Sequence, residues 1–492
     1  MRLTKLAEAV DGRVILGESE VDREILSLSI DSRKKAEGSL FICLVGENAD
    51  GHNHVAEAVQ NGAVAIVCER PVSTNVPQIV VDNARKSMGV IAAAFYGFAA
   101  KKMQIIGITG TNGKTTTAHM LAEILRTAGK KVGIIGTLGV SFGRKKLPPT
   151  LTTPDPIELH AIFAEMLLCG TEYVVMEVSA HALSYYKTEG IEFAAAIFTN
   201  FTQDHLDFFA DMDTYKQAKL RLFKQNTLQV AVLNGDDCVG RELGSICEKH
   251  RIKSVFYGLN TPVDAFAIVT DESLRGTECM LNVNDELCRV SLSMTGRHNV
   301  YNALAAAVCA MELGISTQSI EEGLRSLDGV DGRLQRVTAF NGAEIYVDFA
   351  HTPDGLQNSL RALKTHCLGR LVCLFGCGGN RDKSKRSIMG ETAAKGADFS
   401  VLTSDNPRYE DPLDIITEIE KGYRRFSPQY VIVPDRKRAL DYALDLLKKG
   451  DVLLVAGKGG EYYQEIMGIK YPFNDHDSII ELLAQKGKMP LS

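Results

Sequence analysis

Short apolar runs alternate along the chain with longer stretches of helical character. In the first hundred residues, apolar runs at 40–45, 63–68 and 78–81 are separated by helical stretches and turn residues. From Met103, an apolar run predicts a buried strand that enters a Gly-rich turn, and a helix is predicted from Lys114. Further strands are predicted at 173–178, 194–198 and 230–233. Such alternation predicts a mostly parallel, doubly wound sheet.

A second series of predicted strands follows a GVDGR turn near residue 330. They lie at 344–349, 371–375, 399–403, 430–433 and 452–456, most of them separated by helical stretches. This predicts a Rossmann-like domain, but not a dinucleotide-binding one, because no strand leads into G-x-G-x-x-G with a suitably placed acid. We therefore predict an α/β fold of three domains: a small N-terminal α/β domain (1–100), a central P-loop ATPase-like domain (101–331) and a C-terminal Rossmann-like domain (332–492).

Composition narrows the class of protein. Apolar residues make up 45% and charged residues 24% of the chain, and the net charge of -6 argues against a nucleic-acid or anionic-membrane binder. The eleven cysteines include no C-x-x-C pair, which argues against a disulfide framework or a zinc ribbon. The first residues lack the apolar core of a signal peptide, and no run is long enough for a membrane helix. We expect a cytoplasmic protein with reduced thiols and no membrane insertion.

The segment 107–116, GITGTNGKTT, is the strongest local signal for a ligand. Its glycines allow backbone amides to converge on phosphate oxygens, Lys114 supplies positive charge, and Thr115 can ligate magnesium. It departs from the strict G-x-x-x-x-G-K-[ST] pattern, since Ile108 stands at the first glycine. A plain Gly-rich turn before a helix is the alternative, but Lys-Thr-Thr directly after Gly113 favours ATP. The predicted ATP contacts here are Gly110, Thr111, Asn112, Gly113, Lys114, Thr115 and Thr116.

The spelling TGTNGKTT resembles the signature of the Mur ligase superfamily, which also includes folylpolyglutamate synthetases. Later segments occur in the family's order, and with LSIDSR at 28–33 they extend the resemblance over nearly the whole chain: MEVSAHAL (176–183), TNFTQDHLDFF (199–209), YKQAK (215–219), GRHNVYNALAA (296–306), DFAHTPD (348–354), FGCGGNRDKSKR (375–386), DNPR (405–408) and GKGGE (457–461). The resemblance implies an ATP-dependent ligase. Its nearest branch extends UDP-N-acetylmuramoyl-L-alanyl-D-glutamate in peptidoglycan precursor synthesis, and the DNPR motif is similar to that of the meso-2,6-diaminopimelate-specific enzymes.

The chemistry of such a ligase explains the residue types. A carboxylate is a poor electrophile, so phosphoryl transfer from ATP must first convert it to an acyl phosphate. The carboxylate and ATP are both anions, so bringing them together for this transfer requires magnesium and basic groups. Glu177 ends a predicted strand, where open α/β sheets place their chemistry. From the sequence alone, metal binding and helix capping are equally open for it.

The resemblance assigns roles that the residues alone do not. It implies that Glu177 and His205 contact magnesium, although a lone His beside two acids is more often a loop or cap residue. It also implies that Lys219 is carbamylated and becomes an anionic ligand of a second magnesium, whereas the sequence alone would suggest a solvated lysine. Lys114, Lys219 and His205 are the predicted catalytic residues, and ATP and Mg²⁺ the predicted cofactors.

Other candidates for the ATP site come from later segments. The resemblance places His298, Asn299 and Asn302 near the adenine, although capping and core-edge roles are equally open. Arg333 opens the predicted C-terminal domain, and Asp348 and His351 lie at the end of its first predicted strand. Domain closure could bring these three residues onto ATP; turn and cap chemistry is their alternative.

The DNPR segment is the predicted amino-acid site. It follows a strand and precedes a helical stretch, so a turn with an N-cap is the plain interpretation. Arg408 offers a bidentate fork to a carboxylate and would repel the cationic end of lysine, which favours diaminopimelate. The ammonium group of the amino-acid substrate could donate to Asp405, Asn406 or Glu461. Arg381 is a second predicted partner for a substrate carboxylate. The predicted contacts are Arg381, Asp405, Asn406, Pro407, Arg408, Gly457 and Glu461.

The predicted contacts to the UDP-linked acceptor are Ile30, Ser32, Thr152, Thr153, Ser179, Tyr185 and Lys187, by resemblance. The chain departs from the family's pattern at Tyr185 and Lys187, where Gln and Arg are usual, and at Gly460, where His is usual. A ligase for L-lysine or another diamino acid, or a divergent paralogue with a related acceptor, is therefore an alternative. A P-loop switch or scaffold without ligase chemistry is the non-enzyme alternative. We expect a monomer.

Overall fold

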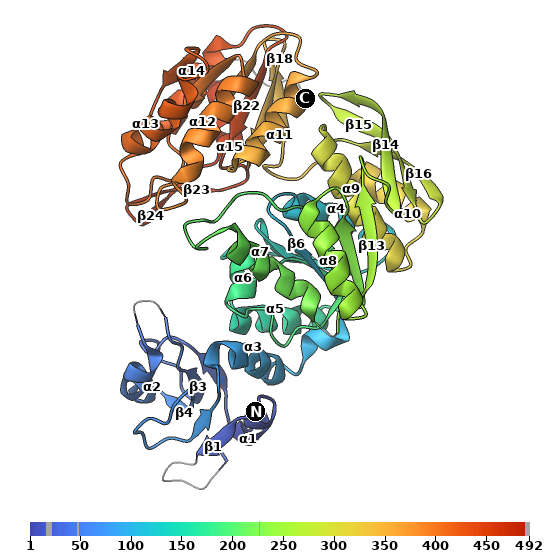
Figure 1. Ribbon diagram of the computed structural model, residues 1–492. Coiled ribbons are helices and arrows are strands. Elements are labelled where there is room, and N and C mark those ends of the chain that lie inside the picture. Colours follow the sequence, from blue (N-terminus) through green and yellow to red (C-terminus); the bar gives the residue numbers. More distant parts are fainter. Residues whose placement is uncertain (16–21, 47–48, 226, 488–492) are drawn as a thin grey trace. The chain divides into compact units, whose positions relative to one another are not determined.

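The structure, a computed structural model, describes residues 1–15, 22–46, 49–225 and 227–487 (Figure 1). It divides into two compact units. The first contains residues 1–107, 131–195 and 225–229, and the second contains residues 108–130, 196–224 and the chain from 230 onward. Within the described residues no helix is long and apolar enough to cross a bilayer. All eleven cysteines are free thiols.

The N-terminal part of the first unit is a five-stranded sheet with helices on both faces. Its strand order is β1-β5-β4-β3-β2, and only β1 is antiparallel to its neighbour. Leu40 and Val67 pack with α1 and α3, whereas Phe41 and Ile66 pack with α2, as the two-residue period of a strand requires. The elements are α1 (Leu3–Glu8), β1 (Arg13–Ile15), β2 (Ser27–Ser29), β3 (Ser39–Ile42), η1 (Gly51–His54), α2 (Val55–Gln60), β4 (Ala63–Cys68), β5 (Gln78–Val80), α3 (Ala84–Phe95) and η2 (Ala99–Lys102).

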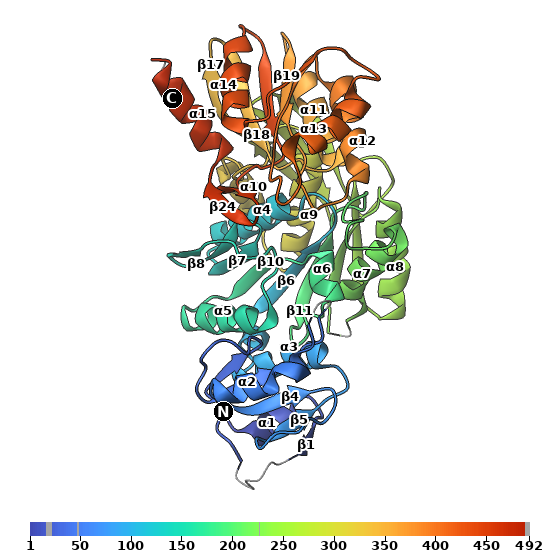
Figure 2. The same ribbon diagram turned by 90° about the vertical axis from the view of Figure 1, so that its left-hand side faces the viewer.

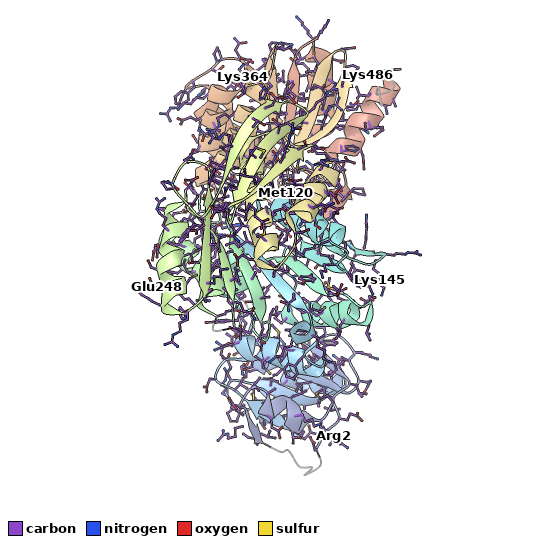
Figure 3. The ribbon with its side chains drawn as sticks, turned by 90° about the vertical axis from the view of Figure 1, so that its right-hand side faces the viewer. Arg2, Met120, Lys145, Glu248, Lys364 and Lys486 are labelled. Atoms are coloured by element: carbon purple, nitrogen blue, oxygen red, sulfur yellow. The ribbon has the colours of Figure 1, made fainter. Side chains whose placement is uncertain are left out.

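The rest of the first unit is built around two paired parallel strands, β7 and β10. Strands β8 and β9 continue from β7 as an antiparallel hairpin, and Lys145 points outward from it (Figure 3). The elements are β6 (Gln104–Thr109), whose last two residues belong to the second unit, β7 (Val132–Gly136), β8 (Gly139–Phe142), β9 (Lys145–Leu147), α5 (Pro156–Leu168), β10 (Tyr173–Glu177) and α6 (Ala180–Ser184).

In the second unit, α4 and α9 form the packed support of the phosphate loop. Met120 on α4 is buried in the interior (Figure 3), and α9 buries an Ala-rich face. Strands β12, β13 and β14 are parallel, while β14, β15 and β16 are antiparallel. The elements are α4 (Lys114–Thr127), β11 (Phe193–Phe198), whose first three residues belong to the first unit, α7 (Met212–Leu220), η3 (Arg221–Lys224), β12 (Val230–Asn234), α8 (Cys238–Lys249), β13 (Lys253–Gly258), β14 (Ala265–Ser273), β15 (Gly276–Val283), β16 (Glu286–Leu292), α9 (Arg297–Glu312) and α10 (Thr317–Ser326).

The C-terminal part of the second unit is a six-stranded sheet between two helical layers (Figures 1 and 2). Its order is β17-β18-β22-β19-β20-β21, with α11, α12 and α13 on one face and α14 and α15 on the other. The elements are β17 (Gln335–Phe340), β18 (Ala343–Asp348), α11 (Pro353–Lys364), β19 (Leu371–Phe375), α12 (Ser384–Gly396), β20 (Phe399–Leu402), α13 (Pro412–Tyr423), β21 (Tyr430–Ile432), α14 (Arg436–Leu446), β22 (Val452–Ala456), β23 (Tyr463–Ile466), β24 (Ile469–Pro472) and α15 (Asp475–Gln485).

The predicted buried strands are found, most with ends shifted by one or two residues. Those predicted at 63–68, 371–375 and 452–456 coincide with β4, β19 and β22. The strand predicted at 40–45 ends at Ile42, and Val45 forms only an isolated bridge to Asp50. The antiparallel strands β8–β9, β14–β16 and β23–β24 were not predicted. Most of them alternate in burial or are largely exposed, so they lack the continuous apolar runs of buried strands, and β8 is mostly buried but only four residues long.

Candidate active site

The phosphate loop connects the end of β6 to the start of α4. The Lys114 Nζ atom donates to the carbonyl oxygens of Gly110 and Thr111, both at 2.9 Å. The Lys219 Nζ atom donates to the same Gly110 carbonyl at 2.7 Å. Gly113 is the N-cap of α4, and Thr115 and Thr116 are buried in its first turn. Two lysine side chains from separate segments therefore meet at one loop oxygen.

Asn200 and Thr199, which follow β11, hold this loop in shape. The Asn200 side chain accepts from the Asn112 N–H at 2.9 Å, and the Thr199 hydroxyl donates to the Asn112 carbonyl at 2.6 Å. The Thr111 hydroxyl contacts the Thr202 carbonyl at 3.1 Å and the Tyr215 hydroxyl at 3.2 Å. These bonds fix the loop before any ligand arrives.

Replacing Gly110 with alanine should abolish ATP binding. Gly110 has φ +146°, and an added Cβ would lie 1.9 Å from the Thr199 hydroxyl oxygen. The loop must therefore shift, and its amides lose their shared direction. Gly129→Ala is the matched control, because Gly129 has φ +76° but nothing within 4 Å of the added Cβ. It should cost only about 1–2 kcal/mol of stability. Calorimetric titration with ATP checks both variants; equal affinities would contradict the expectation.

Lys219 lies on α7 and is 2% exposed. Its Nζ lies 4.6 Å from the centre of the Tyr215 ring. Burial, together with the nearby Lys114 cation, holds the pKa of Lys219 well below its ordinary value, and the Asp204 carboxylate opposes this only in part. The side chain is thus biased toward a neutral amine, which is nucleophilic.

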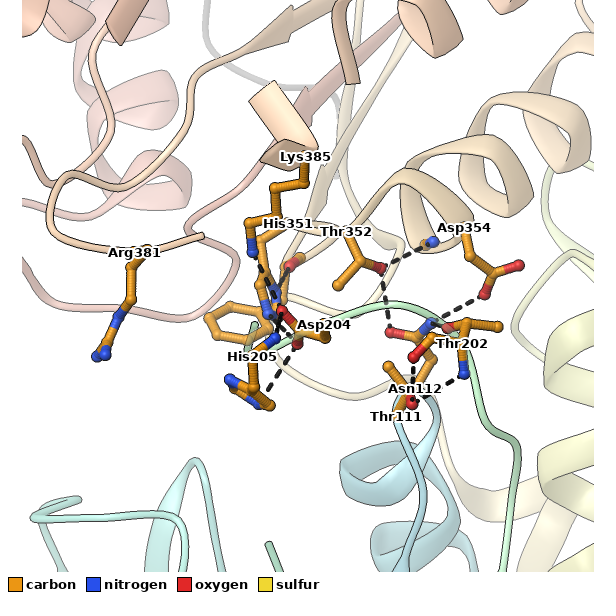
Figure 4. Close-up of polar contacts among 12 residues, drawn as sticks. Thr111, Asn112, Thr202, Asp204, His205, His351, Thr352, Asp354, Arg381 and Lys385 are labelled. Atoms are coloured by element: carbon orange, nitrogen blue, oxygen red, sulfur yellow. Dashed lines mark hydrogen bonds and ion pairs between the residues drawn. The ribbon is translucent and has the colours of Figure 1, made fainter. Parts of the chain in front are cut away.

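Residues of the C-terminal part contact the phosphate loop. An Arg333 Nη2–H donates to the Thr115 hydroxyl at 3.0 Å, and the Arg333 guanidinium stacks 4.2 Å from the centre of the Phe349 ring. Asp354 accepts from the Asn112 amide at 2.9 Å, and the Thr352 hydroxyl lies 3.4 Å from the Asn112 Oδ1 (Figure 4). Arg333, Thr352 and Asp354 thus contact the phosphate loop within the second unit.

Asp204 is the centre of a buried charge cluster that sequence reasoning missed (Figure 4). Its carboxylate lies 3.2 Å from Lys385 Nζ, 3.5 Å from His351 Nε2 and 3.4 Å from His205 Nε2. Burial opposes ionisation of Asp204, but the hydrogen bond from His351 and the charges of His351, Lys385 and His205 outweigh it. Together they hold the pKa of Asp204 well below its usual range.

His205 has φ +57°, a left-handed backbone that is uncommon for a residue with a side chain. The Asp204 carboxylate accepts from the His205 N–H at 2.9 Å, and the His205 carbonyl accepts from the N–H groups of Phe208 and Phe209. Such strain persists only where surrounding bonds impose it, and it is common at functional sites.

His298, Asn299 and Asn302 lie at the start of α9. The Asn302 Oδ1 accepts from Thr117 at 3.2 Å, and its amide donates to Asn299 at 3.2 Å. Burial lowers the pKa of His298, although the Asp348 carboxylate acts in the opposite direction. Asp348 accepts from the Ser359 hydroxyl at 2.5 Å. The capping alternative for Asp348 is wrong, because Thr352 is the N-cap of α11, the helix that follows. The two asparagines therefore link α9 to the helix that carries the phosphate loop.

The DNPR segment pairs with the chain that follows GKGGE. Arg408 is 18% exposed, and its Nε donates to Glu465 at 3.1 Å while its Nη1 donates to the Gly379 carbonyl at 2.7 Å. Asn406 donates to Glu461 at 2.9 Å. The predicted N-cap role of this segment is wrong, because Asp411 caps α13.

Lys458 is fully buried beside the predicted ammonium acceptors. Its Nζ donates to Asn406 at 3.0 Å and to Glu461 at 2.9 Å. Asp405 accepts from the Asn406 N–H at 2.6 Å, and a Cβ on Gly457 would lie 2.6 Å from the Asp405 carboxylate. Arg381 is half exposed and lies 3.5 Å from Asp207. Lys458 thus joins two of the predicted amino-acid contacts, Asn406 and Glu461.

In the first unit, Glu177 ends β10 and accepts from the Thr137 N–H at 2.8 Å and from its hydroxyl at 3.2 Å. The capping alternative for Glu177 is wrong, since Ser179 is the N-cap of α6. The Thr153 hydroxyl donates to the Glu177 carbonyl at 2.9 Å and accepts from the Ser179 N–H at 3.1 Å. The Thr152 hydroxyl oxygen lies 3.2 Å from the Thr137 hydroxyl oxygen.

Two of the three departures from the family's pattern, Tyr185 and Lys187, have partners within the first unit. Lys187 lies 2.8 Å from Asp155 and 3.5 Å from the Thr153 carbonyl. The Arg85 guanidinium lies 4.9 Å from the centre of the Tyr185 ring. Ile30 and Ser32 follow β2, where Ile30 is exposed and the Ser32 hydroxyl donates to Glu57 at 2.5 Å. Lys187 thus keeps a cation near Thr153, and Tyr185 keeps an aromatic face beside Arg85.

Side chains at the phosphate loop fit a magnesium ion that is shared with ATP phosphates. Within the described ranges, no group of three or more His, Cys, Asp or Glu side chains could enclose a metal ion. Mg²⁺ typically binds through one or two side chains together with phosphate oxygens and water. The Thr115 hydroxyl, the His205 imidazole and an anionic form of Lys219 are compatible with that chemistry.

Three family models match the chain in order. Residues 24–96 match the model described as Mur ligase family, catalytic domain, residues 108–310 match Mur ligase middle domain, and residues 332–459 match Mur ligase, glutamate ligase domain. Each match lies inside one of the three predicted domains.

A curated protein of Caldanaerobacter subterraneus subsp. tengcongensis, named UDP-N-acetylmuramoyl-L-alanyl-D-glutamate--2,6-diaminopimelate ligase, is 41% identical over 490 residues, covering 99% of this chain and 100% of that protein. A solved structure with the same name has 30% identity and a TM-score of 0.69, covering 96% of this chain and 98% of the other. A MurF ligase from Thermotoga maritima in complex with ADP has 20% identity and a TM-score of 0.63, covering 94% and 97%, and shows likeness of fold.

Proposed function

Because the chain belongs to the Mur ligase family, we propose that it is an ATP-dependent ligase that joins meso-2,6-diaminopimelate to UDP-N-acetylmuramoyl-L-alanyl-D-glutamate in peptidoglycan precursor synthesis. The observation that carries the proposal is that one unit contains a preformed phosphate loop and two further loops that present Arg381 and Arg408. Relatives 39% to 41% identical over nearly the full chain are named for this reaction.

The reaction has two covalent steps. A carboxylate of the acceptor attacks the γ-phosphorus of ATP, giving an acyl phosphate and ADP. The neutral amine of the diamino acid then attacks the acyl carbon, phosphate leaves with the carbon–oxygen bonding pair, and the nitrogen loses a proton. Lys114 and Arg333 supply positive charge to phosphate oxygens that would otherwise repel the carboxylate.

We propose that Thr115, Glu177, His205 and carbamylated Lys219 hold magnesium, which offsets the negative charge of the phosphates when it is bound. Carbamylation adds carbon dioxide to the neutral Lys219 amine and releases one proton. The depressed pKa of Lys219 favours that neutral form. His298, Asn299, Asn302 and Asp348 are proposed as further ATP contacts.

The same proposal assigns one role to each predicted domain. Residues 1–100 bind the UDP-linked acceptor, residues 101–331 bind ATP, and residues 332–492 bind the diamino acid. The acceptor contacts extend into the central segment at Thr152, Thr153, Ser179, Tyr185 and Lys187, where Lys187 supplies a cation. We propose that the enzyme acts as a monomer in the cytoplasm.

Arg408 is the proposed reader of the carboxylate that distinguishes diaminopimelate from lysine. Arg408→Lys should lower kcat/KM for diaminopimelate, because losing one partner of a bidentate arginine–carboxylate contact costs about 2–5 kcal/mol. Arg408→Asn should lower it further and permit weak addition of lysine, since the repelling cation is gone. The measurement is kcat/KM for both amino acids in each variant. Arg425→Asn, at an exposed position of the same domain, is the control and should change neither.

The overall assignment is tested by the mass of the product formed from UDP-muramoyl-dipeptide, ATP and a panel of amino acids. Diaminopimelate-dependent product and phosphate release are expected. A parent enzyme that prefers lysine would overturn the amino-acid assignment but leave the ligase. ATP turnover that needs neither acceptor nor amino acid would overturn the ligase and favour a nucleotide switch.

A further inference from the structure

Two loops of the C-terminal part are hydrogen-bonded to each other beside the predicted amino-acid site. They are the loop after β19 (376–383) and the DNPR loop after β20 (403–411). The Gly379 N–H donates to the Asn406 carbonyl at 2.8 Å, and Arg408 Nη1 donates to the Gly379 carbonyl at 2.7 Å. A Cβ on Gly379 would lie 1.9 Å from the Pro407 carbonyl, so the two backbones are in direct contact. Arg381 and Arg408 are thus presented from one composite loop structure.

Glu410 joins the two loops through a single carboxylate. Its Oε1 accepts from the Asn380 N–H at 2.5 Å, and the Tyr409 N–H donates back to the Asn380 side chain at 3.0 Å. Asn380 and Arg408 have φ +51° and φ +52°. Two neighbouring segments in left-handed conformation are therefore held by reciprocal bonds around Glu410.

Arg386, at the start of α12, fixes Glu410 from the protein interior. The guanidinium is 1% exposed and binds Glu410 with both Nη atoms, each at 2.9 Å. It also binds Glu418 of α13 at 3.0 Å and the Gly378 carbonyl at 3.3 Å. The Arg386 hydrogen bonds hold the pKa of Glu410 at about 2, so Glu410 stays ionised at neutral pH. A fork of this kind defines both the position and the plane of the carboxylate.

We propose that Glu410, held by Arg386, is a positioning residue for the amino-acid substrate: it locks the two loops so that Arg381 and Arg408 are preorganised for the carboxylates of the incoming amino acid. The inference rests on the proposed function, but not on which amino acid the enzyme prefers. Glu410 is directed at Asn380 and Arg386, so it acts through the arginines and not on the substrate.

Glu418 provides a matched control, because it binds the same buried guanidinium at a similar distance but has no bond to either loop backbone in the described structure. Glu410→Gln and Glu418→Gln each remove one charged partner of Arg386, so both should lower the melting temperature. Only Glu410→Gln places an amide NH₂ where the carboxylate accepted from the Asn380 N–H and the Arg386 guanidinium. Only this variant should therefore separate the two loops.

The experiment measures steady-state kinetics with the amino acid that the parent uses best in the panel assay. Glu410→Gln should raise KM for that amino acid roughly 10- to 100-fold, because the loops lose charge-assisted hydrogen bonds. Its kcat at saturating amino acid and its KM for ATP should stay within about twofold. Glu418→Gln should leave all three parameters near those of the parent.

A second pair keeps the test valid if Glu410→Gln does not fold. Asn380→Gly retains the left-handed backbone but removes the acceptor of the Tyr409 N–H, and should also raise KM for the amino acid. Asn380→Asp restores that acceptor and should return KM toward the parent value. If the Glu410 and Glu418 variants change KM for the amino acid equally, or if kcat falls without a rise in KM, the proposal is wrong. Glu410 would then have only a structural role. A parent without amino-acid-dependent turnover would instead refute the proposed function.

Discussion

Lys114→Ala should lower turnover roughly a thousandfold or more while the protein remains folded. The Lys114 Nζ atom donates to two of the loop carbonyls that frame the phosphate site, so its loss removes charge from the phosphoryl-transfer step. It should also raise the pKa of Lys219, since the Lys114 charge helps to depress it. Phosphate release gives turnover, and thermal denaturation reports folding.

Arg126→Ala is the control for this experiment. Arg126 lies in the last turn of the same helix and forms an exposed pair with Glu123. An exposed pair of this kind contributes about 0.2–1 kcal/mol, so turnover should be unchanged. Near-normal activity of Lys114→Ala would refute the assignment of residues 107–116 as the ATP loop.

Lys219→Ala should reduce turnover to a similar degree, roughly a hundred- to a thousandfold, and a short carboxylic acid added to the buffer should restore part of it. The added carboxylate would occupy the space of the proposed carbamate and supply the missing anionic oxygens. Lys216→Ala, on the same helix, removes a lysine paired with Glu242 and Asp213 and should have little effect.

A spectroscopic readout separates the carbamate from any other role of Lys219. Carbon-13-labelled carbon dioxide should give a carbamate resonance in the parent and in Lys216→Ala, and none in Lys219→Ala. The resonance should weaken as pH falls, because protonation of the amine removes the form that binds carbon dioxide. Its depressed pKa places this loss below the pH at which an ordinary lysine would protonate. An active parent without the resonance would rule out the carbamate.

The parallel core of the fold could be predicted because its strands are continuous apolar runs. Strands such as β19 and β22 are buried on both faces, so their whole sequence is apolar and their ends are sharp. The hairpins β14–β16 and β23–β24 are exposed on one or both faces. Their polar and apolar residues alternate or mix, so they contain no continuous apolar run. A count of two-residue alternation over 276–283 could have found β15.

The site was predictable only where its residues are neighbours in the chain. The phosphate loop carries its chemistry in ten consecutive residues, so spacing alone identified it. Asp204 and Lys385 are 181 residues apart, and no local pattern connects them. Lys219 has the sequence signature of a surface lysine; only the packing of α7 shows that it is buried. Lys458 likewise has the sequence signature of an ordinary loop lysine, and only the packing shows that it is fully buried between Asn406 and Glu461.

The left-handed backbone at residue 408 also restricts the routes by which substrate preference could change over evolution. A replacement must lose the arginine cation and still tolerate φ +52°. Glycine, asparagine and aspartate satisfy both conditions, whereas valine, isoleucine and threonine would strain the main chain. A lineage that moves toward another diamino acid at this position therefore has few acceptable intermediates. The chain conformation, as much as the charge, determines which of them remain folded.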